Sequence, residues 1–111
     1  RFTDTLAQEV KELGISIFAI SVGPTHTELI DYMIESEVGR KWLPDLPKWL
    51  NGKWQPIEWA GTLAVALASG KYDALTGRWV SPEDDLDEML RRIEEVEKDE
   101  LYIWSVKGLK K

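Results

Sequence analysis

Residues 14–27 read Gly-Ile-Ser-Ile-Phe-Ala-Ile-Ser-Val-Gly-Pro-Thr-His-Thr, and this stretch decides the fold class. Its central part, residues 15–22, is short, rich in β-branched side chains and almost continuously apolar. That pattern is typical of an inner strand of a parallel sheet, which neighbouring elements cover on both faces. Gly23-Pro24 breaks the strand. The stretch therefore predicts a buried parallel strand that ends in a tight turn.

An amphipathic helix precedes this strand. Phe2, Leu6, Val10 and Leu13 recur at the spacing of one helical stripe. Gly14 stands where a left-handed glycine ends a helix. A helix, a one-residue turn and a buried strand make the second half of an α/β unit, so we predict an α/β fold.

The start of the chain predicts that the sequence continues upstream. Arg1 is not an initiator methionine, and Phe2 already belongs to the apolar stripe, with no room for a helix cap before it. A doubly wound parallel sheet has about five or six strands, whereas the sequence predicts at most three. We therefore expect residues 1–111 to form a single partial domain, the C-terminal portion of a doubly wound sheet that is incomplete in this chain.

The middle of the chain is expected to hold two helices and a long irregular segment between them. Thr27 is a suitable N-cap for a short helix. Residues 39–55 contain prolines, glycines and three tryptophans but no helical or strand period, which predicts a lid or binding loop. Pro56 can open the next helix and Gly70 can end it.

The last third predicts a short strand, a helix and a terminal strand. The short strand is expected over residues 76–80. Ser81-Pro82-Glu83-Asp84 has the pattern of a helix start with a capping-box-like pair, and an apolar face follows over residues 86–96. Residues 101–106 alternate weakly, as in a terminal strand, and residues 107–111 predict a frayed end.

The composition limits the classes of function. The chain has 111 residues, 43% hydrophobic and 31% charged, which predicts one globular domain at most. With no cysteine and one histidine, it excludes a disulfide scaffold, a thiolate metal site and a multi-histidine metal centre. Its formal net charge of -6 argues against nucleic acid or an anionic membrane as partner. No apolar run approaches the ~18 residues of a membrane span, so we expect a soluble, cytoplasmic protein.

The turn after the predicted strand is the first candidate site. In an open α/β sheet, ligands bind beyond the carboxyl ends of the strands. Gly23 would let a ligand approach the backbone closely, and Thr25 and Thr27 supply hydrogen-bonding groups. The alternative is an ordinary strand-to-helix turn in which Thr27 is the N-cap. His26 has no partner that would make it a metal ligand or a general base, so we interpret it as a surface histidine.

Two further segments have a functional and a structural interpretation. Trp42, Trp49 and Trp54 either form an apolar wall or lid of a substrate pocket, or anchor an irregular segment to the body. A weaker hypothesis makes this segment a carbohydrate or peptide site. Residues 83–100 hold ten acidic side chains against three basic ones, but their spacing does not match a calcium loop. We interpret them as a solvated helix face with ion pairs from Glu88 to the arginines that follow it.

Several motifs, taken in order, resemble the C-terminal half of the short-chain dehydrogenases/reductases. Phe2-Thr3-Asp4-Thr5-Leu6-Ala7-Gln8-Glu9-Val10 and Gly14-Ile15-Ser16-Ile17-Phe18-Ala19-Ile20-Ser21 are similar to a helix and strand of that family. The Gly turn with Thr27 is similar to its Pro-Gly-x-x-x-Thr segment. The later motifs are Leu67-Ala68-Ser69-Gly70, Leu75-Thr76-Gly77-Arg78 and Asp84-Asp85-Leu86. The resemblance that they carry in this order extends over nearly all of residues 1–100.

The resemblance implies a Rossmann fold, NAD or NADP as cofactor, and hydride transfer to or from a carbonyl or alcohol. It matches Gly23 to the glycine of the turn, Thr25 to the residue whose backbone amide meets the nicotinamide carboxamide, and Thr27 to the threonine. Val22 stands where the family usually has proline. The segment 27–56 corresponds to the substrate lid, which makes its tryptophans substrate-side walls.

The resemblance also shows which family features this chain lacks. No triplet of glycines forms the phosphate loop, and no tyrosine is followed four residues later by lysine, so the catalytic pair is absent from this sequence. We divide the chain into a helix–strand–turn unit (1–26), a lid (27–56) and the last helices and strands (57–111). The expected function is part of an NAD(P)-dependent oxidoreductase that acts on a small-molecule substrate and forms a homo-oligomer. The alternative is a non-catalytic assembly module that oligomerises to cover exposed sheet edges.

Overall fold

The computed structural model describes residues 1–105 and residue 108. This part of the chain is mixed α/β and mostly helical, with seven α-helices and one two-stranded parallel sheet. The helices are α1 (Phe2–Val10), α2 (Glu28–Glu35), α3 (Glu37–Trp42), α4 (Leu46–Leu50), α5 (Ile57–Ala68), α6 (Leu86–Arg91) and α7 (Ile93–Lys98). Two short 3-10 helices are η1 (Lys11–Leu13) and η2 (Asp73–Leu75). The strands are β1 (Ala19–Ile20) and β2 (Trp79–Val80).

The sheet joins two segments that lie far apart in the sequence. β1 and β2 are parallel, with Ala19 opposite Trp79 and Ile20 opposite Val80. The ladder continues past both strands, because Gly77 N–H donates to Ile17 O over 2.6 Å and Ser21 N–H donates to Val80 O over 2.8 Å. The predicted mixed α/β class is therefore confirmed, and so is a short strand within residues 76–80.

The prediction for residues 15–22 is wrong in extent and in burial. The strand covers Ala19–Ile20 only, although backbone hydrogen bonds reach from Ile17 to Ser21. Ile15 is 49% exposed and Val22 58% exposed, so the segment is not covered on both faces. The physical reason is that β1 has a single neighbour, β2, within the described residues, whereas an inner strand needs one on each side.

Several helix boundaries follow the local chemistry that predicted them. Gly14 ends the first helical segment in the left-handed conformation, with φ 71°. Thr27 caps α2, since its hydroxyl oxygen accepts from Ile30 N–H over 3.4 Å. Pro56 directly precedes α5, and Gly70, with φ 85°, follows its last turn. Caps and left-handed glycines act within one turn, so the sequence alone locates them.

The irregular segment predicted over residues 39–55 is instead mostly helical. Ser36 caps α3, where its hydroxyl oxygen accepts from Gly39 N–H over 3.0 Å. Pro47 lies in the first turn of α4, where a missing N–H costs nothing. The two helices are only six and five residues long, too short for an apolar period to be recognised.

The helix predicted from Ser81 begins later. One half of the capping-box-like pair forms, since Ser81 N–H donates to Asp84 Oδ2 over 2.7 Å, whereas the Ser81 hydroxyl oxygen accepts from Glu83 N–H over 3.2 Å and not from Asp84 N–H. Those contacts close a turn, and Asp85 is the actual N-cap of α6, accepting from Glu88 N–H over 2.9 Å. The apolar face over residues 86–96 is confirmed in its buried positions, but the helix breaks at Arg92 into α6 and α7.

The predicted terminal strand is not formed over residues 101–105. One backbone bond connects this segment to the sheet, from Trp79 N–H to Tyr102 O over 2.8 Å. Tyr102 has φ 58°, a left-handed conformation that interrupts an extended strand. Val106 and, apart from Gly108, the frayed end predicted over residues 107–111 lie outside the described residues.

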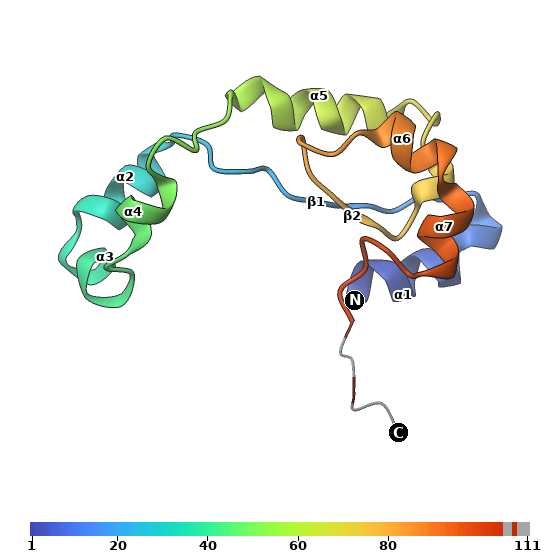
Figure 1. Ribbon diagram of the computed structural model, residues 1–111, viewed down its shortest axis with the longest axis horizontal. Helices are drawn as coiled ribbons and strands as arrows, with labels where there is room; N and C mark the ends of the chain where they lie inside the picture. The colour runs from blue at the N-terminus through green and yellow to red at the C-terminus, as the bar shows by residue number, and fades with distance from the viewer. Residues whose placement is uncertain (106–107, 109–111) are drawn as a thin grey trace.

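The core lies between α5, the sheet and α6. Its buried side chains are Leu63, Leu67, Tyr72, Leu75, Val80, Leu86 and Met89. Figure 1 shows α2, α3 and α4 as a separate cluster, which we call the hairpin (residues 27–55), connected to the body by the segment before α2 and the segment after α4. The body alone therefore supplies the core, and the hairpin projects from it.

Candidate functional site

A pocket of about 530 Å³ lies just past the carboxyl ends of the two parallel strands. Ser21, Gly23 and Pro24 line it after β1, and Ser81, Glu83 and Asp84 line it after β2. The remaining lining residues are Lys53, Gln55, Trp79 and Tyr102. The candidate site is thus where sheet topology places ligands in open α/β folds.

The turn after β1 is shaped by Gly23. Its φ is 69°, a conformation that side chains other than glycine rarely adopt. A Cβ added at Gly23 would overlap the side-chain oxygen of Gln55. The space over this glycine, which the sequence assigned to an approaching ligand, is therefore occupied by a side chain of the protein.

Gln55 connects three segments around the pocket. Its backbone N–H donates to Pro24 O over 2.8 Å, which ties the end of the hairpin to the turn. Its side-chain Nε2 donates to Glu83 Oε1 over 2.7 Å, which ties it to the turn after β2. Neither Gln55 nor Glu83 was predicted as a site residue, because only the folded chain brings positions 23, 55 and 83 together.

Of the three predicted cofactor-turn residues, only Gly23 lines the pocket. The hydroxyls of Thr25 and Thr27 form hydrogen bonds with backbone atoms three residues away. Thr25 Oγ1 donates to Val22 O over 3.5 Å, and Thr27 is the N-cap of α2. His26 is a surface residue that contacts Asp31 over 3.2 Å (Nε2 to Oδ1).

The predicted substrate-wall tryptophans lie on or beside the hairpin helices. Trp42 is 71% and Trp49 64% exposed, and the Lys41 ammonium lies 5.3 Å from the Trp42 ring centroid. Trp54 packs edge-on against His26, with ring centroids 4.9 Å apart. None of the three lines the pocket, whose aromatic walls are Trp79 and Tyr102.

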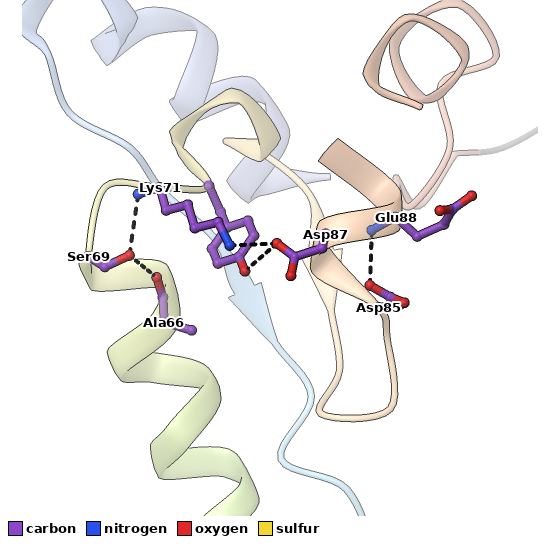
Figure 2. A network of polar contacts seen from close by, with 7 residues as sticks. Ala66, Ser69, Lys71, Asp85, Asp87 and Glu88 are labelled. Carbon is purple, nitrogen blue, oxygen red and sulfur yellow. Dashed lines mark hydrogen bonds and ion pairs between the residues drawn. The ribbon is translucent and has the colours of Figure 1, made fainter. Parts of the chain in front are cut away.

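A second polar cluster connects the end of α5 to α6, away from the pocket (Figure 2). Asp87 Oδ1 accepts from Lys71 Nζ over 2.7 Å and from the Tyr72 hydroxyl over 2.9 Å. These donors hold the pKa of Asp87 below its ordinary value, and the carboxylate raises the pKa of Lys71. Because Tyr72 is buried and Asp87 is at the surface, the cluster fastens the core to α6.

The acidic helices carry the predicted ion pairs. Glu88 contacts Arg91 over 2.6 Å and Arg92 over 3.9 Å. Arg92 also donates two hydrogen bonds to the carboxylate of Glu95, which raise the pKa of the guanidinium. The predicted solvated, paired face is confirmed. In the described residues no group of three or more acidic or histidine side chains could hold a metal ion.

The described helices are all too short or too polar to cross a bilayer. Comparison of the chain with protein-family models, curated proteins and solved structures finds no match.

Proposed function

We propose that this chain is the cofactor-turn and lid portion of an NAD(P)-dependent short-chain dehydrogenase/reductase, with a Rossmann-like sheet, acting on a carbonyl or alcohol. The segment that would meet the cofactor is the turn around Gly23, Thr25 and Thr27, of which Gly23 lines the pocket. The catalytic tyrosine and lysine would come from residues outside this sequence. The proposal rests on the resemblance of the motifs and on one structural observation.

That observation is the position of the pocket. Two parallel strands end side by side, and the residues that follow each of them line one depression of about 530 Å³. In a doubly wound sheet this edge is where dinucleotides bind. The sequence order also agrees, because the turn after β1 is the one that resembles the nicotinamide segment.

The lining residues fit the nicotinamide end of such a cofactor. Trp79 and Tyr102 supply flat aromatic surfaces, and Ser21 and Ser81 supply hydroxyl donors and acceptors for a carboxamide. When bound, NAD or NADP would supply the hydride acceptor or donor. This chain would orient the ring and exclude water from one side of it, and a phosphate loop elsewhere would bind the rest.

The hairpin is proposed as the substrate side. Trp42 and Trp49 expose most of their indole surface, which is large and apolar. Such a surface suits an apolar small molecule that lies between the hairpin and the cofactor. Pro24, in the turn before the hairpin, and Gln55, at its end, would be the pivots of a hairpin movement, and one backbone hydrogen bond joins them.

The coding sequence upstream of Arg1 tests the proposal directly. We expect a glycine-rich loop after a first strand and Tyr-x-x-x-Lys shortly before Arg1. An upstream region without these motifs contradicts the proposal.

Ligand binding by the 111-residue chain tests the pocket itself. We expect nicotinamide mononucleotide to shift the NMR signals of Gly23, Ser81 and the Trp79 indole. Gly23→Val should abolish the shifts. Gly52→Val is the matched control, since Gly52 has φ 70° but faces open space outside the pocket. Equal binding by both variants contradicts the site.

The alternative function, an assembly module, is favoured by the open shape of the chain. Its Cα radius of gyration is 17.1 Å, against about 13 Å for a compact domain of this length. It exposes 8720 Å², about 2,500 Å² more than a typical folded protein of its mass. Either a preceding segment or a second copy of the chain can cover such an area. Light scattering after size exclusion tests the module, because a monodisperse monomer of the 111-residue chain contradicts it.

A further inference from the structure

We propose that Gln55 is a positioning residue for the turn at Gly23, where its carboxamide packs over a glycine that the left-handed φ of 69° already favours. The part of this inference that concerns ligand affinity rests on the proposed function. The part that concerns the turn itself does not. Gln55 acts on a ligand through the backbone of residues 23–24, which its side chain and its amide both hold.

The orientation of the Gln55 amide follows from its partner. A carboxylate only accepts hydrogen bonds, so the group that lies 2.7 Å from Glu83 Oε1 is the NH₂. The carbonyl oxygen Oε1 then points to Gly23. Glu83 therefore fixes which end of the amide meets the turn.

This arrangement has a local cost. Gln55 Oε1 is buried and accepts no hydrogen bond from any described residue. A buried acceptor without a donor is unfavourable, whereas a solvent-facing rotamer would satisfy it. The Glu83 bond and the backbone bond to Pro24 O offset that cost and keep the side chain against Gly23.

Gln55 therefore connects three segments that line the pocket. Gln55 ends the hairpin, Pro24 belongs to the turn that precedes it, and Glu83 belongs to the turn after β2. All three line the pocket. A displacement of the hairpin must therefore move the Gly23–Pro24 turn, or break both contacts of Gln55.

A donor–acceptor exchange tests the link in the 111-residue chain. Gln55→Glu brings two carboxylates together, and Glu83→Gln added to it restores a donor opposite an acceptor. The readout is the rate of hydrogen exchange of the backbone amide at position 55, which donates to Pro24 O. At pH 7 we expect about tenfold faster exchange in the single variant, the scale of one lost charged hydrogen bond, and near wild-type exchange in the double variant.

One reference amide and one matched variant control this measurement. The Ser21 amide, which donates to Val80 O in the ladder, should keep its exchange rate throughout. Gln8→Glu creates the same carboxylate pair on α1, because Gln8 Nε2 donates to Asp4 Oδ1 over 3.2 Å. That variant should leave the amide at position 55 unchanged. An unchanged amide in Gln55→Glu, or no recovery in the double variant, overturns the positioning role.

The pH dependence separates positioning from a general loss of structure. In Gln55→Glu, acidification should restore slow exchange, normalised to the intrinsic rate, as one of the two facing carboxylates is protonated. The double variant, which carries both Gln55→Glu and Glu83→Gln, has no pair of facing carboxylates. Its exchange should therefore not slow on acidification. The other ionisable side chains that line the pocket, Lys53, Asp84 and Tyr102, are present in every variant that is compared.

Affinity for nicotinamide mononucleotide distinguishes this inference from the proposed function. Weaker binding by Gln55→Glu, recovered in the double variant, is the expected result. If the wild type binds and Gln55→Glu binds equally well, the positioning role is overturned and the function stands. If the wild type does not bind, the function is contradicted, while hydrogen exchange still decides whether Gln55 holds the turn.

Discussion

The backbone N–H of Ile17 donates to Thr76 Oγ1 over 2.9 Å, and the Thr76 hydroxyl donates back to Ile17 O at 3.4 Å. These two residues are 59 positions apart in the sequence. Their contact lies just before the paired strands, where Gly77 N–H also donates to Ile17 O. The Thr76 side chain thus satisfies the backbone N–H of Ile17, which lies outside the paired strands. The two-way contact also supports the register in which β1 pairs with β2.

Removal of the Thr76 hydroxyl should weaken the start of the ladder. Thr76→Val keeps the shape but leaves the part-buried Ile17 N–H without its acceptor, which costs about 1–2 kcal/mol of unfolding free energy. Thr76→Ser keeps the hydroxyl and is the control. Urea denaturation measures both. A Thr76→Val protein as stable as Thr76→Ser would show that water replaces the hydroxyl.

Acid should weaken the attachment of α6 to the core. Lys71 and Tyr72 lower the pKa of Asp87 in the folded state, so its stabilising effect is present above the unfolded pKa, about 3.9, and is lost as the pH falls through the lower folded pKa. Thermal unfolding between pH 6 and 2 should show this loss. Asp87→Asn should remove the contribution from Asp87 and flatten the curve. An identical curve for the variant contradicts the prediction.

The buried guanidinium of Arg78 should not stabilise the fold. Arg78 is 9% exposed, and its Nε and Nη1 have no hydrogen-bond partner among the described residues. Replacing an unpaired buried charge by an apolar side chain of similar length is often neutral or stabilising. We expect Arg78→Met to match or exceed the wild type in unfolding free energy, and Arg78→Ala to lose stability through a cavity. Equal losses in both would indicate that the guanidinium is paired in solution.

The centre of the small core should tolerate truncation poorly. Leu75 is fully buried at 0% exposure, so Leu75→Ala should cost about 2–5 kcal/mol. Val65, on the outer face of α5, is 72% exposed, and Val65→Ala should change stability by less than about 0.5 kcal/mol. Chemical denaturation of the pair measures the contrast. Similar losses of stability in both variants would contradict the burial of Leu75 in the core.

Features that depend on neighbouring residues could be predicted from the sequence. Gly14 in its left-handed conformation, Thr27 as a cap and the pairs of Glu88 with its arginines all act within one helical turn. Residues 81–85 show the limit of such reasoning. Asp84 accepts from Ser81 N–H as the motif predicts, yet Asp85 starts the helix, because such short-range bonds also close an isolated turn.

The candidate site could be predicted only in part. The position of Gly23 after a strand indicated the edge of the sheet at which the pocket lies. The role of Gln55 and Glu83 could not be found, because each is an ordinary surface residue type until residues 23, 55 and 83 come together. The tryptophans show the opposite case: Trp42, Trp49 and Trp54 are conspicuous in the sequence, while the aromatic walls of the pocket are Trp79 and Tyr102.

The sequence by itself determined the α/β class, the apolar face over residues 86–96 and four helix ends, since propensity, capping and periodicity act over a few residues. Only the tertiary structure decided which strand pairs with residues 17–21, where the pocket lies, and that Gln55 rather than a ligand covers Gly23. These features depend on contacts between segments 28 to 59 residues apart. Such contacts form because burial and hydrogen bonding over the whole chain outweigh the entropy of closing long loops, and no local pattern records that balance.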